Sequence, residues 1–413
     1  MVKFNRFVLD NGLRVIVHED HTTPMAVLNI LYDVGARDES PDQTGFAHLF
    51  EHLMFGGSVN IPQYDEPLQR VGGENNAFTT NDITNYYITL PAENIETAFW
   101  LESDRMLSLA FSEKSLEVQR NVVVEEFKQR YLNQPYGDVW LKLRPMVYKE
   151  HPYRWATIGK ELKHIEDARI EDVKAFFKKH YNPQNAVMVI GGNIDTAKAR
   201  ELAEKWFGPI PAGEKYLRNL PKEPEQHEAR RESVTAKVPL NDLYIAFRMP
   251  ARLEEGYYEI DLVSDILSRG NSSRLHRTLV KNKELFSEIH AYNMGSFDSG
   301  MFVVEGKPAE HVSIETAEAA IWEELEKIKN ELVPGDELTK VKNKTESTMV
   351  FSEMSLLDKA MNLAMFELFG DADMLNHETD KYLAITAERI KEQAQKVFRK
   401  ENSSTLVYLA ERH

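Results

Sequence analysis

Residues 45–55 read Gly-Phe-Ala-His-Leu-Phe-Glu-His-Leu-Met-Phe, and the apolar residues in this stretch recur at the spacing of a helix that buries one face. On such a helix His48 and His52 leave the same face one turn apart, as two histidines must to bind one metal ion. Glu51 lies on nearly the same face and can reach a water held by that metal. Two histidines, one carboxylate and one water form a catalytic zinc site rather than a structural one. The alternative is a pair of ordinary packed or surface histidines, so the hypothesis requires a third ligand and a matching scaffold.

The composition of the chain limits the classes of protein to consider. With 413 residues, the chain is too long for one ordinary core and indicates two domains of about 200 residues each. The sequence contains no cysteine, which excludes disulfides and thiolate ligands and leaves His, Asp and Glu for a metal. The net charge of −16 argues against a nucleic-acid partner. An acidic enzyme would attract basic peptides, and the alternative is a charge that only keeps the surface soluble.

The sequence also bears on location. No run of about 18 apolar residues is present, so we expect no membrane span. The first ten residues have neither the apolar core nor the small-residue cleavage site of a signal peptide. We therefore expect a cytoplasmic protein, or a periplasmic one if a signal was trimmed before this numbering begins.

Strand and helix patterns alternate along the first half of the chain. A hairpin is expected at residues 4–17, around the turn Asp10-Asn11-Gly12. Further strands are expected at 25–34, 84–90 and 186–191, and a turn within 71–80 opens another. Helices are expected at 95–106, at 112–132 with Ser112 as the N-cap, and at 170–180.

An internal repeat relates the two halves. Residues 165–170 (Ile-Glu-Asp-Ala-Arg-Ile) resemble residues 385–390 (Ile-Thr-Ala-Glu-Arg-Ile), and the same offset places Asn182 on Asn402. Each copy reads as a helix, a turn containing asparagine and a strand, although two common helix-to-strand units could also coincide. We predict an α+β fold of two tandem homologous domains, each an antiparallel-rich sheet packed with helices. The expected domains are residues 1–213, which carry the zinc motif, and 233–413, joined by a polar linker at 214–232.

The helix expected at 112–132 carries Glu125-Glu126-Phe127, some way after the His-x-x-Glu-His motif. This arrangement resembles the pitrilysin/insulinase family of zinc peptidases, the inverzincins. Mitochondrial processing peptidase, whose beta subunit is of the same short two-domain type, and insulin-degrading enzyme belong to it. Further similar stretches extend the resemblance over the whole chain: Asp10-Asn11-Gly12-Leu13-Arg14-Val15, Gly72-Gly73, Asn76-Ala77 and Tyr181-Asn182-Pro183.

The resemblance implies roles for individual residues. His48 and His52 correspond to zinc ligands and Glu51 to the general base. Glu126 corresponds to the third ligand, because the family's ligand precedes a bulky apolar residue, as Glu126 does and Glu125 does not. Seven residues before the ligand the family usually has a second glutamate near the metal, and here this position is Gln119.

The resemblance also implies what the site acts on. Asn76, Ala77 and Phe78 correspond to a strand that pairs with an extended substrate, although they also fit an ordinary sheet edge. The implied activity is zinc-dependent endopeptidase cleavage of unstructured peptides, with one zinc ion per chain, inside a chamber formed between domains or subunits.

The second half departs from the family pattern. Active members usually carry there an arginine and, seven residues later, a tyrosine that help bind substrate, and these positions are Val280 and Ser287. Arg274, Arg277 and Tyr292 are close in sequence but wrongly spaced. One interpretation is a zinc-bearing subunit that needs a homologous partner carrying the arginine and tyrosine. The others are a homodimer with weak activity and a non-catalytic assembly subunit, which the intact zinc motif disfavours.

Overall fold

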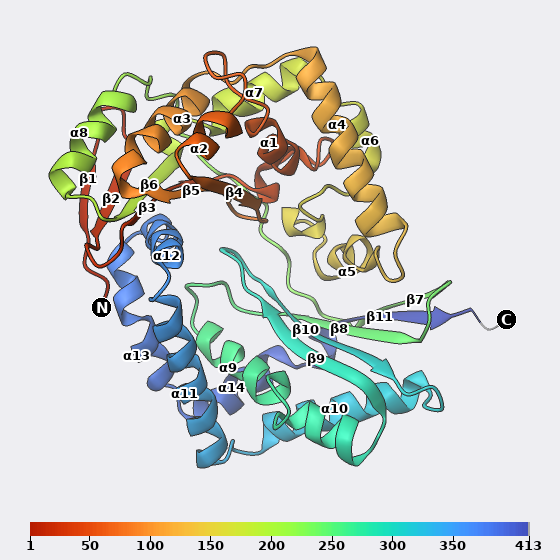
Figure 1. Cartoon of the computed structure of the whole chain (residues 1–413). Coiled ribbons are helices and arrows are strands. Elements are labelled where there is room, and N and C mark those ends of the chain that lie inside the picture. Colours follow the sequence, from red (N-terminus) through yellow and green to blue (C-terminus); the bar gives the residue numbers. More distant parts are fainter. Residues whose placement is uncertain (412–413) are drawn as a thin grey trace. The chain divides into compact units, whose positions relative to one another are not determined.

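The computed structural model describes residues 1–411 and contains two β-sheets, each packed with helices (Figure 1). Packing divides the chain into two compact units. Unit 1 consists of Met1–Lys128, Trp155–Leu220 and Val350–His377, and unit 2 of Gln129–Arg154, Pro221–Met349 and the residues from Glu378 on. The predicted α+β class with two antiparallel-rich sheets is confirmed. Within the described part of the chain, no helix is both long and apolar enough to cross a membrane.

The sheet of unit 1 has six strands in the order β1-β2-β6-β3-β5-β4. All neighbouring strands are antiparallel except β2 and β6. β4 lies at one edge, and no further strand of the described residues pairs with its outer side. The strands are β1 (Asn5–Val8), β2 (Arg14–Glu19), β3 (Met25–Tyr32), β4 (Glu74–Thr79), β5 (Thr84–Pro91) and β6 (Ala186–Gly192).

The sheet of unit 2 repeats this topology without a counterpart of β1. Its five strands have the order β7-β11-β8-β10-β9, and β7 and β11 are the parallel pair. The order of β7 to β11 thus matches that of β2 to β6, which supports the predicted homology of the two halves. The strands are β7 (Arg230–Ala236), β8 (Asp242–Arg248), β9 (Phe286–Met294), β10 (Met301–Pro308) and β11 (Ser403–Ala410).

The structure corrects the register of the repeat, because the counterpart of Asn402 is Asn185 rather than Asn182. Both asparagines end a short 3₁₀ turn before the last strand of their sheet. Asn185 donates to the carbonyls of His180 (2.9 Å) and Asp33 (3.2 Å). Asn402 donates to those of Val397 (2.8 Å) and Arg248 (3.0 Å). The similar stretches in the sequence are therefore about one helical turn out of register.

Each unit includes a helix from the other half of the chain. α5 (Val139–Val147) shares a core with β8 and β11 of the second sheet. α12 (Leu356–Leu368) packs on β6 and β3 of the first sheet (Figure 1). Gly192 allows this approach, since a Cβ there would lie 3.0 Å from Leu356 Cδ2 and 2.3 Å from the Met25 carbonyl. The boundaries predicted at residues 213 and 233 separate the two sequence repeats. The two packing units do not follow these boundaries, because each unit also includes residues from the other half of the chain.

The remaining helices pack against the sheets or against one another. In unit 1 they are α1 (Phe46–Met54), α2 (Asp65–Arg70), α3 (Ile95–Leu107), α4 (Glu113–Phe127), α6 (Leu162–Glu166), α7 (Ile170–His180) and α8 (Thr196–Trp206). In unit 2 they are α9 (Tyr257–Ser268), α10 (Ile314–Asn330), most of α11 (Gly335–Ser352), α13 (Glu378–Leu383) and α14 (Ala387–Val397).

The first part of the predicted linker is bound to unit 1. Arg218 donates to Asp38 Oδ1 at 2.7 Å and to Asp33 Oδ1 at 2.9 Å. The ring of Tyr216 lies 4.6 Å from the ring of His180, at the end of α7. His180 is buried, and neither of its ring nitrogens has a hydrogen-bond partner within residues 1–411. Burial lowers the pKa of His180 to about 3, and the nearby charges of Lys179 and Arg218 act in the same direction.

His180 should make the stability of unit 1 depend on pH. In an unfolded chain the pKa of histidine is about 6.5, so below this pH the unfolded state binds a proton that the folded state does not. The free energy of unfolding should therefore fall as the pH decreases from 6.5 toward 3, by up to ~1.4 kcal/mol per pH unit from this residue. In urea denaturation between about pH 7.5 and 4.5, His180→Leu should show a shallower slope. At the highest pH, the difference in the free energy of unfolding between variant and wild type measures the change in packing alone. A pH slope equal to that of the wild type would contradict the lowered pKa of His180.

Candidate metal centre

α1 buries its apolar face and turns its polar residues to the other side. Phe46, Leu49, Phe50 and Leu53 are buried, and the ring of Phe50 stacks on Tyr181 with centroids 4.8 Å apart. The helix begins after Gly45, whose φ of 87° is left-handed. A Cβ at Gly45 would lie 2.5 Å from the Ile158 carbonyl oxygen, so only glycine fits this start. The helix predicted from residues 45–55 is confirmed.

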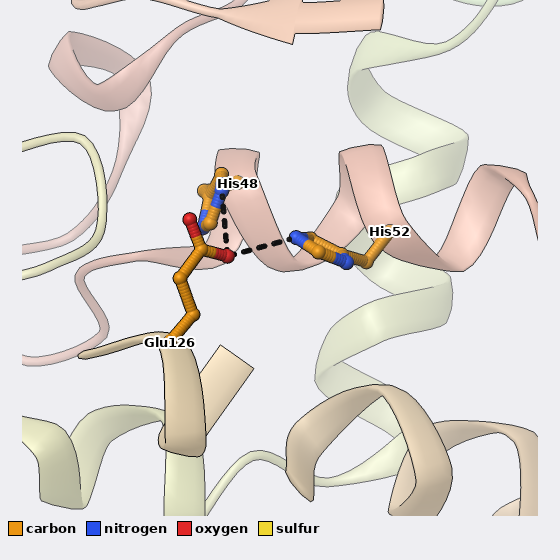
Figure 2. Close-up of side chains that lie close together, drawn as sticks. All are labelled: His48, His52 and Glu126. Atoms are coloured by element: carbon orange, nitrogen blue, oxygen red, sulfur yellow. Dashed lines mark ion pairs between the residues drawn. The ribbon is translucent and has the colours of Figure 1, made fainter. Parts of the chain in front are cut away.

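The structure brings Glu126 of α4 to the two histidines of α1. Figure 2 shows the Glu126 carboxylate facing both imidazoles, with Oε2 3.3 Å from His52 Nε2 and 3.7 Å from His48 Nε2. One nitrogen or oxygen from each of the three residues lies within 4.8 Å of the others. Zinc bonds of about 2.0–2.1 Å place the donors of a tetrahedral site roughly 3.3 Å apart. The donor set and its spacing therefore fit a zinc ion.

Glu125 lies outside this group. Its carboxylate is exposed and pairs with Lys128 at 2.7 Å. Gln119 lies two turns before Glu126 on α4 and is half-buried, and its side chain makes no hydrogen bond with another described residue. Helical structure continues beyond α4 as a π-helical turn over Lys128–Leu132, so the helix expected at 112–132 is present throughout.

Glu51 lies between the two ligand positions on α1 but contacts a different element. Its Oε2 accepts a hydrogen bond of 2.6 Å from Thr79 Oγ1, at the end of β4. Burial raises the pKa of Glu51, and the hydrogen bonds from the Thr79 hydroxyl and backbone oppose this rise. Glu51 is thus a half-buried carboxylate next in sequence to the candidate metal ligand His52.

Asn76, Ala77 and Phe78 lie in the middle of edge strand β4. The strand alternates, with Asn76 and Phe78 exposed and Ala77 half-buried on the same side as Thr79. The outer side of β4 has no partner strand among the described residues, so an extended segment can add there, although the Ala77 N–H already donates to the side-chain oxygen of Asn76 (2.8 Å).

Two buried charged residues that the sequence analysis did not identify hold the ends of α1. Glu39 accepts hydrogen bonds from the backbone N–H groups of Gly45 (2.9 Å) and Ala47 (2.8 Å). Burial raises the pKa of Glu39 to about 8, and these two hydrogen bonds favour its ionised form. Arg105 donates to the carbonyl of Met54 at the other end (3.4 Å).

The positions of both groups suit the ends of a helix: the Glu39 carboxyl accepts from free N–H groups at the N-terminus, and the Arg105 cation lies at the C-terminus, which the helix dipole favours. Six residues separate Glu39 from Gly45 in the sequence, too far for a standard N-cap pattern, and Arg105 lies on another helix. Only the fold brings these charges to α1.

The comparison with known proteins finds the same family in both halves. Residues 14–153 match the family model Insulinase (Peptidase family M16), and residues 167–345 match the model Peptidase M16 inactive domain. The chain is 30% identical to the Zinc protease PqqE of Helicobacter pylori over 98% of this chain and 93% of that protein. It is 29% identical to the beta subunit of the yeast (Saccharomyces cerevisiae) mitochondrial-processing peptidase, over 50% of this chain and 45% of that subunit.

A solved structure agrees with these similarities. The crystal structure of a protease from Helicobacter pylori has a TM-score of 0.93 to this chain at 28% identity, and covers 99% of this chain and 100% of that one. Together with the matches to the family models in both halves and the full-length similarity to a named zinc protease, this shows that the chain belongs to peptidase family M16, the insulinase family.

Proposed function

We propose that the chain is a zinc-dependent endopeptidase that cleaves peptides offered in an extended conformation. The convergence of His48, His52 and Glu126 carries this proposal, because two imidazoles and one carboxylate leave a fourth position for water or substrate. Relatives named zinc proteases support the class of reaction. The chamber implied by the family resemblance belongs to this proposal, and so do the roles of Gln119 and of residues 76–78.

The reaction divides between the ion and the side chains. When bound, zinc supplies Lewis acidity, which acidifies water and polarises the scissile carbonyl. His48, His52 and Glu126 hold the ion. Glu51 takes the proton from the attacking water and returns it to the leaving amine. The outer side of β4 orients the peptide backbone by strand addition, which selects unstructured segments because a folded chain cannot offer a free strand.

The ligands can be tested by metal analysis. The purified chain should contain close to one zinc ion, and His52→Ala and Glu126→Gln should both lose it, because each removes one of three protein ligands. Glu125→Gln is a matched control, since Glu125 pairs with Lys128 instead, and should keep its zinc. Full zinc content in His52→Ala would refute the site.

The base can be tested separately from the metal. Glu51→Gln should keep its zinc and its fold but lose peptide hydrolysis by about 10²-fold or more, since general-base catalysis contributes at least that much. Cleavage of a quenched fluorescent peptide measures the rate, and metal analysis checks the zinc. Turnover equal to that of the wild type would remove Glu51 from this role.

A second candidate function is that of a zinc-bearing subunit which needs a homologous partner. The positions expected to carry arginine and tyrosine hold side chains with other contacts in unit 2. Val280 packs against the hydrophobic core, and Ser287 donates to the Lys307 carbonyl (3.1 Å). Of the possible substitutes, Arg274 pairs with Glu337 and Tyr292 with Glu305. In this alternative the partner supplies the missing groups, whereas a purely non-catalytic subunit would bind no zinc and cleave nothing.

Activity measurements on the isolated chain distinguish these two candidate functions. Loss of a donor to the developing oxyanion typically costs about 10²- to 10³-fold in rate, so we expect the chain alone to bind zinc and to cleave peptides slowly. Turnover should rise on addition of a homologous chain that carries the arginine and the tyrosine. The molecular mass in solution should be measured in parallel. Efficient turnover by a pure monomer or homodimer would exclude the need for a partner.

A further inference from the structure

We propose that Thr79 is a positioning residue for Glu51: its hydroxyl sets the direction in which the carboxylate faces and links the base to the edge strand. This inference rests on the proposed function. Thr79 is the last residue of β4, and its Oγ1 donates to Glu51 Oε2 at 2.6 Å.

The strand geometry directs Thr79 at α1. Side chains alternate along β4, so Asn75, Ala77 and Thr79 share the half-buried face, while Glu74, Asn76 and Phe78 are exposed. α1 packs against β4. A threonine in a strand has few χ1 rotamers, because both branches at Cβ meet the backbone. The donor is therefore largely pre-oriented, whereas a free glutamate side chain has three rotatable bonds and no fixed direction.

Several hydrogen bonds hold the turn that follows Thr79. The hydroxyl of Thr80 accepts from the backbone N–H groups of Asp82 and Ile83, both at 3.1 Å. The N–H of Thr80 donates to the Ile83 carbonyl at 2.8 Å. Across the hairpin Thr79 pairs with Thr84, whose hydroxyl donates to the Val34 carbonyl at 2.9 Å. Few motions are left that could withdraw Thr79 from Glu51.

Residues 35–39 contact the elements that carry both partners of the Thr79–Glu51 hydrogen bond. The N–H of Ala36 donates to the Thr80 carbonyl (3.2 Å) and that of Arg37 to the Asn81 carbonyl (2.8 Å), so residues 35–39 are tied to the hairpin. The same segment ends in Glu39, which binds the start of α1. Gly35 allows the contact, since a Cβ there would lie 2.5 Å from the Asn81 carbonyl oxygen.

A peptide that adds to β4 is thereby coupled to the base. The outer side of β4 offers the backbone groups for strand addition, and Thr79, on this same strand, holds one oxygen of Glu51. The carboxylate keeps a constant direction relative to a peptide paired with the strand. Catalytic groups need this kind of fixed geometry, because small misplacements are costly in rate.

The test removes the hydroxyl without changing the volume of the side chain. Thr79→Val should lower kcat by about 10-fold or more, as expected for a hydrogen bond to a charged group, with KM changed by less than about 2-fold and zinc retained. Thr79→Ser keeps the donor and should restore kcat to within about 3-fold of the wild type. The matched control is Thr89→Val on β5, a half-buried threonine of the same hairpin, which should leave kcat unchanged.

A readout independent of activity uses the metal-free protein. In a double-mutant cycle of Thr79→Val and Glu51→Leu, the effects on the thermal unfolding midpoint should be non-additive, because each change alone removes the same hydrogen bond. Additive effects, an unchanged kcat in Thr79→Val, or a Thr79→Ser as slow as Thr79→Val would each overturn the inference. If Glu51→Gln itself keeps full turnover, the proposed function fails. If Glu51→Gln is inactive while Thr79→Val keeps the turnover of the wild type, the proposed role of Thr79 is refuted and the proposed function stands.

Discussion

The hydrogen bonds from the backbone of Gly45 and Ala47 to the buried carboxylate of Glu39 determine where α1 begins, and α1 carries three of the four residues at the centre. A helix of nine residues has little stability of its own. It is held here by the carboxyl group of Glu39 at its N-terminus, by Arg105 at its C-terminus and by an aromatic layer beneath Phe50. The direction of both imidazoles follows from these contacts.

The fourth residue, Glu126, and the proposed positioning residue, Thr79, reach α1 from elements that are tied to the same frame. Glu126 lies on α4, which packs against α1. Thr79 lies on the β4–β5 hairpin, which is bonded to residues 35–37 next to Glu39. Ligands, base and edge strand therefore belong to one unit and are positioned by short-range contacts within it.

The two halves share a topology but not a site. The strand order of the second sheet repeats that of the first, and the asparagine that closes the last turn binds equivalent carbonyls in both. In unit 2 the π-helical turn His276–Asn282 and strand β9 carry Val280 and Ser287, which serve the packing and hydrogen bonding of that unit. Duplication of a fold thus preserves its core constraints, while the chemistry of each copy depends on a few side chains.

The sequence by itself determined the elements whose signals are local. The spacing of His48, Glu51 and His52 predicted one helix with one polar face, and this helix is present. The order of strand and helix patterns, with the repeat, predicted two α+β halves, and both sheets are observed. Glu126 was chosen over Glu125 only through the family resemblance, and the structure places Glu126 beside the histidines.

Tertiary structure decided everything that depends on contacts between residues distant in the chain. No periodicity could indicate that Glu39 and Arg105 hold α1, or that Thr79 binds Glu51, because these pairs come from different elements. The register of the repeat was misplaced by about a turn, since two helix starts can look alike while hydrogen bonds to distant carbonyls fix the equivalence of Asn185 and Asn402. The exchange of α5 and α12 also escaped the sequence, because an amphipathic pattern reveals that a helix buries one face but not which sheet it covers.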